Sequence, residues 1–326
     1  MSSKVLITRE IPEKGIQILR KSGRDCIINK TGRPMTRNDL ETNIKEVDAV
    51  ISMLYDRIDQ PLLAMASNLR IVANYAVGID NIDVNACTAS GITVTNTPGV
   101  LTEATADLTL ALILSAARKI VSADRYFREG LFNGWDPLLF VGESLTDKTL
   151  GIIGMGRIGQ AVAKRARGFD MRIIYHNRKP LPDNITASLE AKYYPLDEVI
   201  READFLSLHL PYSPEAHHLI NKERLKMMKP GAYLINTARG AHVDEKSLVD
   251  HLRSKKIAGA ALDVYESEPL PAKGLVSLDN VTLLPHLGSA TVYARDAMAE
   301  MAASSIIAVL SGHKPLNIIN PQVFAG

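Results

Sequence analysis

The chain has 326 residues, which is too long for one small hydrophobic core and indicates two domains. Its 38 basic and 36 acidic side chains nearly balance, so the charge indicates neither a nucleic-acid nor an anionic-membrane partner. The two cysteines, Cys26 and Cys87, have neither metal-site nor disulfide spacing, and we expect both to be buried in a protein from a reducing compartment.

Short apolar segments alternate with segments of helical length along the whole chain. In the first part, strands are predicted at 5–8, 26–29, 49–53, 71–74 and 92–95. A second series is predicted at 150–153, 172–175, 205–208, 233–236, 259–264 and 281–284. Such alternation produces parallel sheets with helices on both faces. The predicted fold class is therefore α/β, with two doubly wound parallel-sheet domains.

Two turn-forming segments separate these series. The run 96–99 (Asn-Thr-Pro-Gly) precedes a long helix that starts near Thr102, and 285–289 precedes a final helix at about 291–311. Because that last helix is long enough to return to the first lobe, we predict a discontinuous domain. The predicted domains are 1–98 with 288–326, and 99–287. A cleft between two lobes is where a cofactor and a small substrate would meet.

The most apolar helical segment is 106–117. It carries Asp107 and is shorter than the roughly 20 residues that a membrane-spanning helix needs. The first residues enter a strand at once, without the apolar run of a signal peptide. We therefore expect a soluble cytoplasmic protein with no membrane partner.

The segment 149–179 predicts a dinucleotide-binding unit. It consists of an apolar strand, a G-x-G-x-x-G turn, an amphipathic helix and a second strand, in the order that such a βαβ unit requires. Gly154 would form the tight turn, Gly156 would let a pyrophosphate approach, and Gly159 would let the helix pack closely. The pyrophosphate would bind the free amides of the helix N-terminus. The predicted contacts are Gly154, Met155, Gly156, Arg157, Ile158 and Gly159.

The second strand of this unit ends in basic residues. NAD-binding units usually have an acidic residue there for the ribose 2′-hydroxyl, whereas this chain has His176, Asn177, Arg178 and Lys179. A guanidinium and an ammonium can pair with a 2′-phosphate, which a carboxylate would repel. We therefore predict that NADP(H) is preferred and NAD(H) is possible. The alternative is that Arg178 and Lys179 are ordinary solvated loop charges.

Three further strand ends have polar side chains. Arg239 follows one strand. Asp263 lies at the end of the next strand and Glu268 comes after it, and His286 follows the last strand. Arginine matches a carboxylate bidentately, and histidine suits proton transfer near neutral pH. Together with an acidic residue, they form the set needed to reduce a 2-keto acid. Taken alone, Arg239 could equally form an interdomain salt bridge.

Other polar residues are interpreted as structural. Glu266 is expected to be a solvated loop charge. His209, His217 and His218 have no metal-ligand spacing, so we predict no metal site. The sequence also lacks a G-x-S-x-G elbow, a P-loop and a C-x-x-C pair.

In combination, these motifs make the chain similar to the D-isomer-specific 2-hydroxyacid dehydrogenases. GMGRIG, NTARG, LDVYESEP and PHLGSAT occur in that family's order and at about its spacing, over essentially the full length. YAVGIDNID, NTPGVLTEATADLTLALIL and the basic HNRK make the glyoxylate/hydroxypyruvate reductases the most similar group. The resemblance implies a Rossmann NAD(P)-binding domain and a flavodoxin-like substrate-binding domain.

The resemblance also implies roles for individual residues. Arg239 would be the substrate-binding arginine of the family, Glu268 the acidic partner and His286 the proton donor. Glu268 would orient the imidazole and favour its protonated form. The remaining substrate contacts would be the amides of Val77 and Gly78, the apolar wall of Leu54, and Trp135, which would reach into a partner subunit's site. The remaining cofactor contacts would be Thr105, Pro211, Thr237, Ala238, Asp263, His286 and Gly288.

These observations predict an oxidoreductase that reduces glyoxylate, and hydroxypyruvate, with hydride from NADPH, and the resemblance implies a homodimer. One alternative is a reductase of a larger 2-keto acid such as 2-ketogluconate, since the shape of the loop around Leu54 and Tyr55 cannot be derived from the sequence. The other is a dinucleotide-sensing protein similar to the corepressors of the family. Peptide-binding extensions or long disordered tails would favour that alternative, and this sequence has neither.

Overall fold

The computed structural model describes residues 2–324; the parts of the predicted domains at 1, 325 and 326 lie outside them. The chain forms two compact units, which are treated separately below. Unit 1 comprises Met1–Leu101 and Ala290–Gly326, and unit 2 comprises Thr102–Ser289. The predicted domain limits, 98/99 and 287/288, lie a few residues from these limits.

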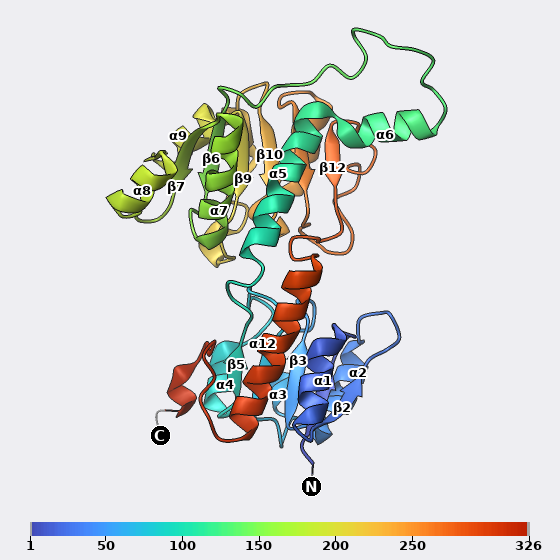
Figure 1. Cartoon of the computed structure of the whole chain (residues 1–326), viewed down its shortest axis with the longest axis vertical. Coiled ribbons are helices and arrows are strands. Elements are labelled where there is room, and N and C mark those ends of the chain that lie inside the picture. Colours follow the sequence, from blue (N-terminus) through green and yellow to red (C-terminus); the bar gives the residue numbers. More distant parts are fainter. Residues whose placement is uncertain (1, 325–326) are drawn as a thin grey trace. The chain divides into compact units, whose positions relative to one another are not determined.

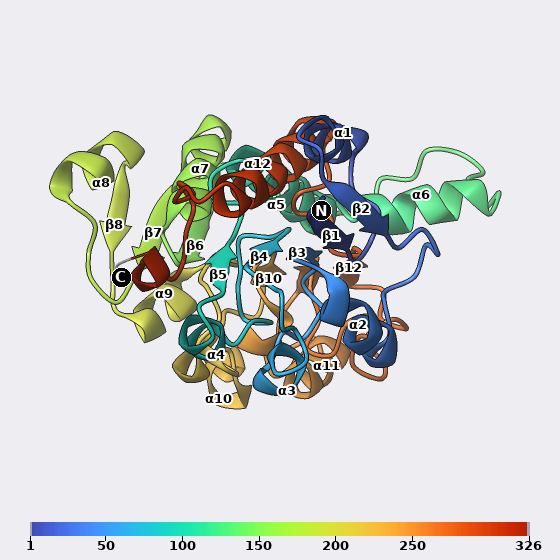
Figure 2. The ribbon, with the colours of Figure 1, turned by 90° about the horizontal axis from the view of Figure 1, so that it is seen from below.

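Unit 1 is built on a parallel five-stranded sheet in the order β2-β1-β3-β4-β5. Its strands are β1 (Lys4–Ile7), β2 (Asp25–Ile28), β3 (Ala49–Ser52), β4 (Ile71–Asn74) and β5 (Thr93–Thr95). Figure 2 shows α1 (Glu13–Lys21) and α12 (Val292–Leu310) on one face of this sheet, and α2 (Arg37–Asn43), α3 (Gln60–Leu63) and α4 (Val84–Ala89) on the other. The order reverses between β1 and β3, the flavodoxin-like arrangement.

Unit 2 is built on a parallel seven-stranded sheet in the order β12-β11-β10-β9-β6-β7-β8. The strands are β6 (Thr149–Ile153), β7 (Arg172–His176), β8 (Ala191–Tyr193), β9 (Phe205–Leu208), β10 (Tyr233–Asn236), β11 (Gly259–Leu262) and β12 (Val281–Leu283). The helices are α5 (Thr102–Arg118), α6 (Ile120–Arg128), α7 (Arg157–Ala166), α8 (Asp183–Leu189), α9 (Leu196–Glu202), α10 (Lys222–Met227) and α11 (Glu245–Arg253) (Figure 1). Across the sheet, the strands β8-β7-β6-β9-β10-β11 lie in the order of a dinucleotide-binding fold.

Alternate side chains of the central strands enter different cores, as a doubly wound sheet requires. In β6, Ile152 packs into the core shared with α5 and α7, whereas Ile153 packs into the core shared with α9, α10 and α11. In β9, Phe205 joins the first core and stacks on Tyr233 at 5.1 Å between ring centroids, whereas Leu206 joins the second. The predicted α/β fold class with two parallel sheets is confirmed.

Several local expectations differ from the structure. The predicted strands begin or end within two residues of the observed ones, but β8 has no counterpart among them. This edge strand has only three residues and two of its side chains are exposed, so it has no apolar pattern. Cys87 is buried as expected, but Cys26 is only half-buried. Within residues 2–324, no helix combines the length and apolar character needed to cross a membrane.

Candidate active site

The glycine-rich turn between β6 and α7 leaves space for a phosphate. Gly154 has φ +98°, in the left-handed region that favours glycine, and a Cβ there would lie 2.6 Å from the backbone of His209. A Cβ at Gly156 would meet only open space, whereas one at Gly159 would lie 2.4 Å from the carbonyl oxygen of Gly154. Among the described residues, no side chain caps α7, so its first N–H groups are available to an anion. The residues present therefore fit a bound dinucleotide.

The end of β7 is tied to this turn. The backbone N–H of Met155 donates to Asn177 Oδ1 at 2.7 Å, which places the predicted ribose contacts beside the glycine-rich turn. Arg178 and Lys179 follow on the exposed surface, and neither forms a salt bridge within residues 2–324. Both charges are thus positioned to meet an anion from solvent.

Hydrogen bonds through Thr109 link three of the predicted nicotinamide contacts, Thr105, Thr237 and Gly288. Thr105 on α5 donates its hydroxyl to the carbonyl oxygen of Gly288 at 2.9 Å. The hydroxyls of Thr109 and Thr237 lie 3.1 Å apart. Ala238 and Pro211 follow β10 and β9 at the carboxyl edge of the sheet.

His286 stands on a strained turn that Asp263 holds in place. It has φ +58°, which is uncommon for a residue with a side chain. Asp263 is fully buried directly after β11, and its carboxylate accepts the N–H groups of Leu287 (2.6 Å) and Gly288 (2.8 Å). The N–H of His286 donates to the Asp263 carbonyl at 2.9 Å. Burial raises the pKa of Asp263, while these donors and the His286 charge oppose that rise.

Glu268 faces the imidazole of His286. Its two carboxylate oxygens lie 3.1 and 3.0 Å from His286 Nδ1, and one of them accepts the N–H of Tyr265 at 3.2 Å. Burial raises the pKa of Glu268, but the hydrogen bond and charge of His286 outweigh it, so the pKa lies below its usual range. The Arg239 charge lowers it further. Glu268 is therefore ionised at neutral pH.

Arg239 lies on the neighbouring loop, three residues after β10. Its Nη1 donates to the Ala238 carbonyl at 2.7 Å, and Asn236 Nδ2 donates to the Arg239 carbonyl at 2.8 Å. The next residue, Gly240, packs directly on the backbone of Tyr265, where a Cβ would come within 1.8 Å. This close approach brings the Arg239 loop against the loop with Glu268. Unit 2 thus assembles the predicted trio at one sheet edge.

Glu266 is an exposed loop residue, as expected, but its carboxylate also has hydrogen-bond partners. Its carboxylate binds His218 Nε2 at 2.7 Å and accepts the N–H of Glu245 at 3.4 Å. The possible ligand atoms of His217, His218 and Glu266 lie within 4.8 Å of one another. The two imidazoles stack, with 4.1 Å between ring centroids and 20° between ring planes. His217 thus contacts His218 by stacking, and His218 binds Glu266 by a hydrogen bond.

In unit 1, three consecutive carbonyls at the carboxyl edge point toward the fold. The carbonyl of Ala76 accepts the N–H of Thr97 (2.8 Å), that of Val77 accepts Asn96 Nδ2 (2.7 Å), and that of Gly78 accepts Asn74 Nδ2 (2.7 Å). A trans peptide directs its N–H opposite to its carbonyl, so the N–H groups of residues 77–79 point away. Among the described residues, none of these three N–H groups has an acceptor. We call these three N–H groups the residue 77–79 nest, because adjacent backbone N–H groups without acceptors are available to an anion.

Leu54 lies on the loop after β3, beside this edge of unit 1. Asp56 holds that loop, because its buried carboxylate accepts the N–H of Met53 at 2.7 Å and the hydroxyl of Thr8 at 2.5 Å. Asn81 Nδ2 also donates to the Met53 carbonyl at 3.0 Å. The sequence analysis missed Asn74, Asn96 and Asp56. A polar residue at or just beyond an apolar strand was the available signal.

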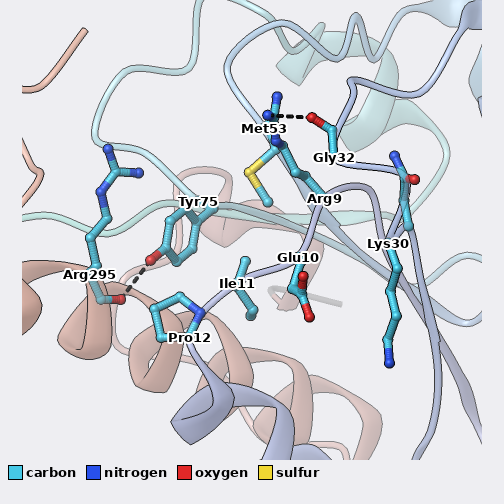
Figure 3. Close-up of a pocket in the computed structure, with 10 residues that line it drawn as sticks. Arg9, Glu10, Ile11, Pro12, Lys30, Gly32, Met53, Tyr75 and Arg295 are labelled. Atoms are coloured by element: carbon cyan, nitrogen blue, oxygen red, sulfur yellow. Dashed lines mark hydrogen bonds between the residues drawn. The ribbon is translucent and has the colours of Figure 1, made fainter. Parts of the chain in front are cut away.

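A cavity of about 450 Å³ also lies at the carboxyl edge of the unit 1 sheet. Figure 3 shows Tyr75 at its side, with the hydroxyl donating to the Arg295 carbonyl at 2.6 Å. The side chains of Arg9, Lys30 and Arg295 point in different directions and do not converge on one point (Figure 3). None of the predicted site residues lines this cavity.

Comparisons with known proteins identify the family of the chain. Residues 110–288 match the family described as "D-isomer specific 2-hydroxyacid dehydrogenase, NAD binding domain". The glyoxylate reductase of Thermococcus litoralis is 48% identical over 327 residues, which cover 99% of this chain and 98% of that protein.

Two solved structures extend this similarity to the fold. The TT0316 protein from Thermus thermophilus has a TM-score of 0.92 and 46% identity, covering 97% of this chain and 99% of that one. An NADPH-dependent glyoxylate/hydroxypyruvate reductase from Sinorhizobium meliloti, solved with NADP and malonate, has a TM-score of 0.85 and 32% identity, covering 98% of this chain and 97% of that one. The resemblance that the motifs indicated is confirmed: the chain belongs to the D-isomer specific 2-hydroxyacid dehydrogenases and is an NAD(P)-dependent enzyme of that family.

Proposed function

We propose that the protein reduces glyoxylate, and also hydroxypyruvate, to the 2-hydroxy acid with NADPH as the hydride donor. The contact between His286 and Glu268, beside Arg239 in the dinucleotide-binding unit, is the observation that supports this proposal most. Relatives that share 48% of the sequence over nearly the whole chain are glyoxylate reductases. The proposed reaction needs one proton donor and one cationic oxygen ligand, and this edge of unit 2 offers both.

The nicotinamide, when bound, supplies a hydride to the keto carbon. Glu268 holds His286 through Nδ1, so the imidazolium gives its proton to the keto oxygen from Nε2. Arg239 binds that oxygen, where negative charge develops in the transition state. The hydroxyl of the product is thus formed from the keto oxygen and the His286 proton.

We propose that the residue 77–79 nest binds the substrate carboxylate. Three N–H groups directed away from the fold can donate several hydrogen bonds to a carboxylate, and these donors carry no net charge. Asn74 and Asn96 fix their direction by holding the carbonyls of Gly78 and Val77. The half-buried Leu54 is proposed as the apolar wall that limits substrate size.

The His286→Ala variant tests the proton-donor assignment. We expect glyoxylate reduction to lose roughly 10²–10⁴ in kcat, because a positioned acid contributes about that much. NADPH binding, followed by fluorescence, should change little. The exposed His313→Ala is the matched control; wild-type kcat in His286→Ala would contradict the assignment.

We propose that NADP(H) is preferred over NAD(H). Asn177, Arg178 and Lys179 replace the acidic residue that would repel a 2′-phosphate, and the two cations are exposed beside the glycine-rich turn. The S. meliloti relative, which was solved with NADP, is consistent with this proposal.

Charge deletion at the end of β7 tests the cofactor preference. The double variant Arg178→Gln/Lys179→Gln should raise the KM for NADPH at least about tenfold and leave the KM for NADH nearly unchanged, because only NADPH has the 2′-phosphate. The exposed Lys222→Gln serves as the control. Equal losses for both cofactors would show that these cations do not bind the 2′-phosphate.

We also propose a homodimer, in which Trp135 would contact the partner's site. Trp135 is 84% exposed, and α6 with the loop after it exposes several other large apolar side chains, as protein–protein contact surfaces do. These side chains are Ile120, Val121, Phe127, Leu131, Phe132, Trp135, Leu138 and Val141. A cytoplasmic location stays a prediction.

Sedimentation velocity tests the oligomeric state. We expect a dimer at micromolar concentration, and a Phe127→Asp/Leu131→Asp variant should sediment as a monomer, since charges on these side chains would have to be buried. The exposed Leu270→Asp, outside the α6 segment, should remain a dimer. A monomeric wild-type protein would contradict the proposal.

A further inference from the structure

Glu245 is a buried carboxylate that the proposed reaction does not use. It is the first residue of α11 and only 2% exposed. One of its carboxylate oxygens accepts the N–H of Glu266 at 2.6 Å, and the other accepts the N–H of Ala272 at 2.7 Å. Residues 266–272, which we call the Glu268 loop, therefore have both ends bound to one side chain.

Burying this carboxylate is unfavourable without its hydrogen bonds. Burial raises the pKa of Glu245, and the charges of Glu266 and Glu268 raise it further, whereas the two backbone donors lower it. The first turn of α11 favours a negative charge, but this offsets only part of the cost of burial. An acid kept at such a position indicates that both of its oxygens are needed.

A second set of contacts links the Glu268 loop to its surroundings. Glu266 binds His218 Nε2 at 2.7 Å and accepts the N–H of Glu245 at 3.4 Å. The N–H of His218 donates to the Ala241 carbonyl at 2.8 Å, next to the residue that packs on Tyr265. The loop therefore has supports at its ends, while Glu268 between them faces His286.

We propose that Glu245 is a positioning residue that keeps Glu268 against His286 by binding both ends of the Glu268 loop. This inference rests on the proposed function, in which His286 donates the proton. Glu245 forms no described hydrogen bond with Glu268 or His286; the loop backbone links it to Glu268, and the charges of the two carboxylates also repel each other. Its loss should therefore reduce the proton-transfer step more than substrate or cofactor binding.

The Glu245→Gln variant is the first test. Glutamine has a single oxygen, so one of the two N–H groups would meet an NH₂ donor and lose its acceptor. We expect kcat for glyoxylate to fall about tenfold or more, with the Kd for NADPH and the KM for glyoxylate within about twofold of wild type. Glu245→Asp, which keeps both oxygens, should lose less. Glu198→Gln, an exposed acid on α9, should match wild type.

The ratio of the losses separates positioning from general damage. Because Glu268 faces His286 alone of the proposed catalytic groups, Glu245→Gln should lower kcat for glyoxylate far more than NADPH binding or the midpoint of urea unfolding. Parallel losses in kcat, NADPH binding and urea stability would overturn the proposal.

Histidine NMR separates this inference from the proposed function. The His286 ring resonances, assigned with His286→Ala, should differ in chemical shift between Glu245→Gln and wild type, whether or not glyoxylate is the substrate, because Glu268 contacts this ring. Absence of glyoxylate turnover in the wild-type protein would contradict the proposed function alone. Identical His286 ring shifts in both proteins would contradict the positioning role alone.

Discussion

The contact between Glu268 and His286 Nδ1 depends on two loops that follow neighbouring strands of one parallel sheet. Because β11 and β12 run in the same direction, both loops leave the sheet at the same edge. Asp263 then shapes the turn at His286, and the Gly240 backbone fits against Tyr265 at the start of the other loop. The sheet and the contacts between its loops therefore determine the distance between Glu268 and His286.

The same principle applies within unit 1. The side chains of Asn74 and Asn96 and the backbone N–H of Thr97 hold three carbonyls toward the fold, and planarity of the peptide then directs three N–H groups outward. Asp56 similarly fixes the loop with Leu54. In both units, side chains at some distance from any ligand determine the direction of backbone groups that could bind one.

Much of this could be predicted from the sequence. Apolar runs such as 71–74 and 205–208 predicted β4 and β9 with the observed limits, because buried parallel strands are apolar on both faces. The strand ends predicted that Arg239, Glu268 and His286 would share an edge. The basic end of β7 and the glycine-rich turn also lie together as their spacing suggested.

The remaining features depend on tertiary contacts. The edge strand β8 is half polar, so its pairing with β7 decides its conformation. Glu266 has the sequence context of a solvated loop, yet His218, 48 residues earlier in the chain, lies 2.7 Å from it. Glu245 has the ordinary position of an acid at a helix N-terminus, and only the loop folded over it shows which N–H groups it binds.

Steady-state reduction of glyoxylate, hydroxypyruvate and 2-ketogluconate, each with NADPH and with NADH, tests the central claim most directly. Our account predicts the highest kcat/KM for the two small acids with NADPH, because the pair of Glu268 and His286 is formed and the end of β7 is basic. A kcat/KM for 2-ketogluconate far above the other two would instead show that the protein is a reductase of larger 2-keto acids. Cofactor binding without turnover of any of the three acids would contradict the roles assigned to Arg239, Glu268 and His286.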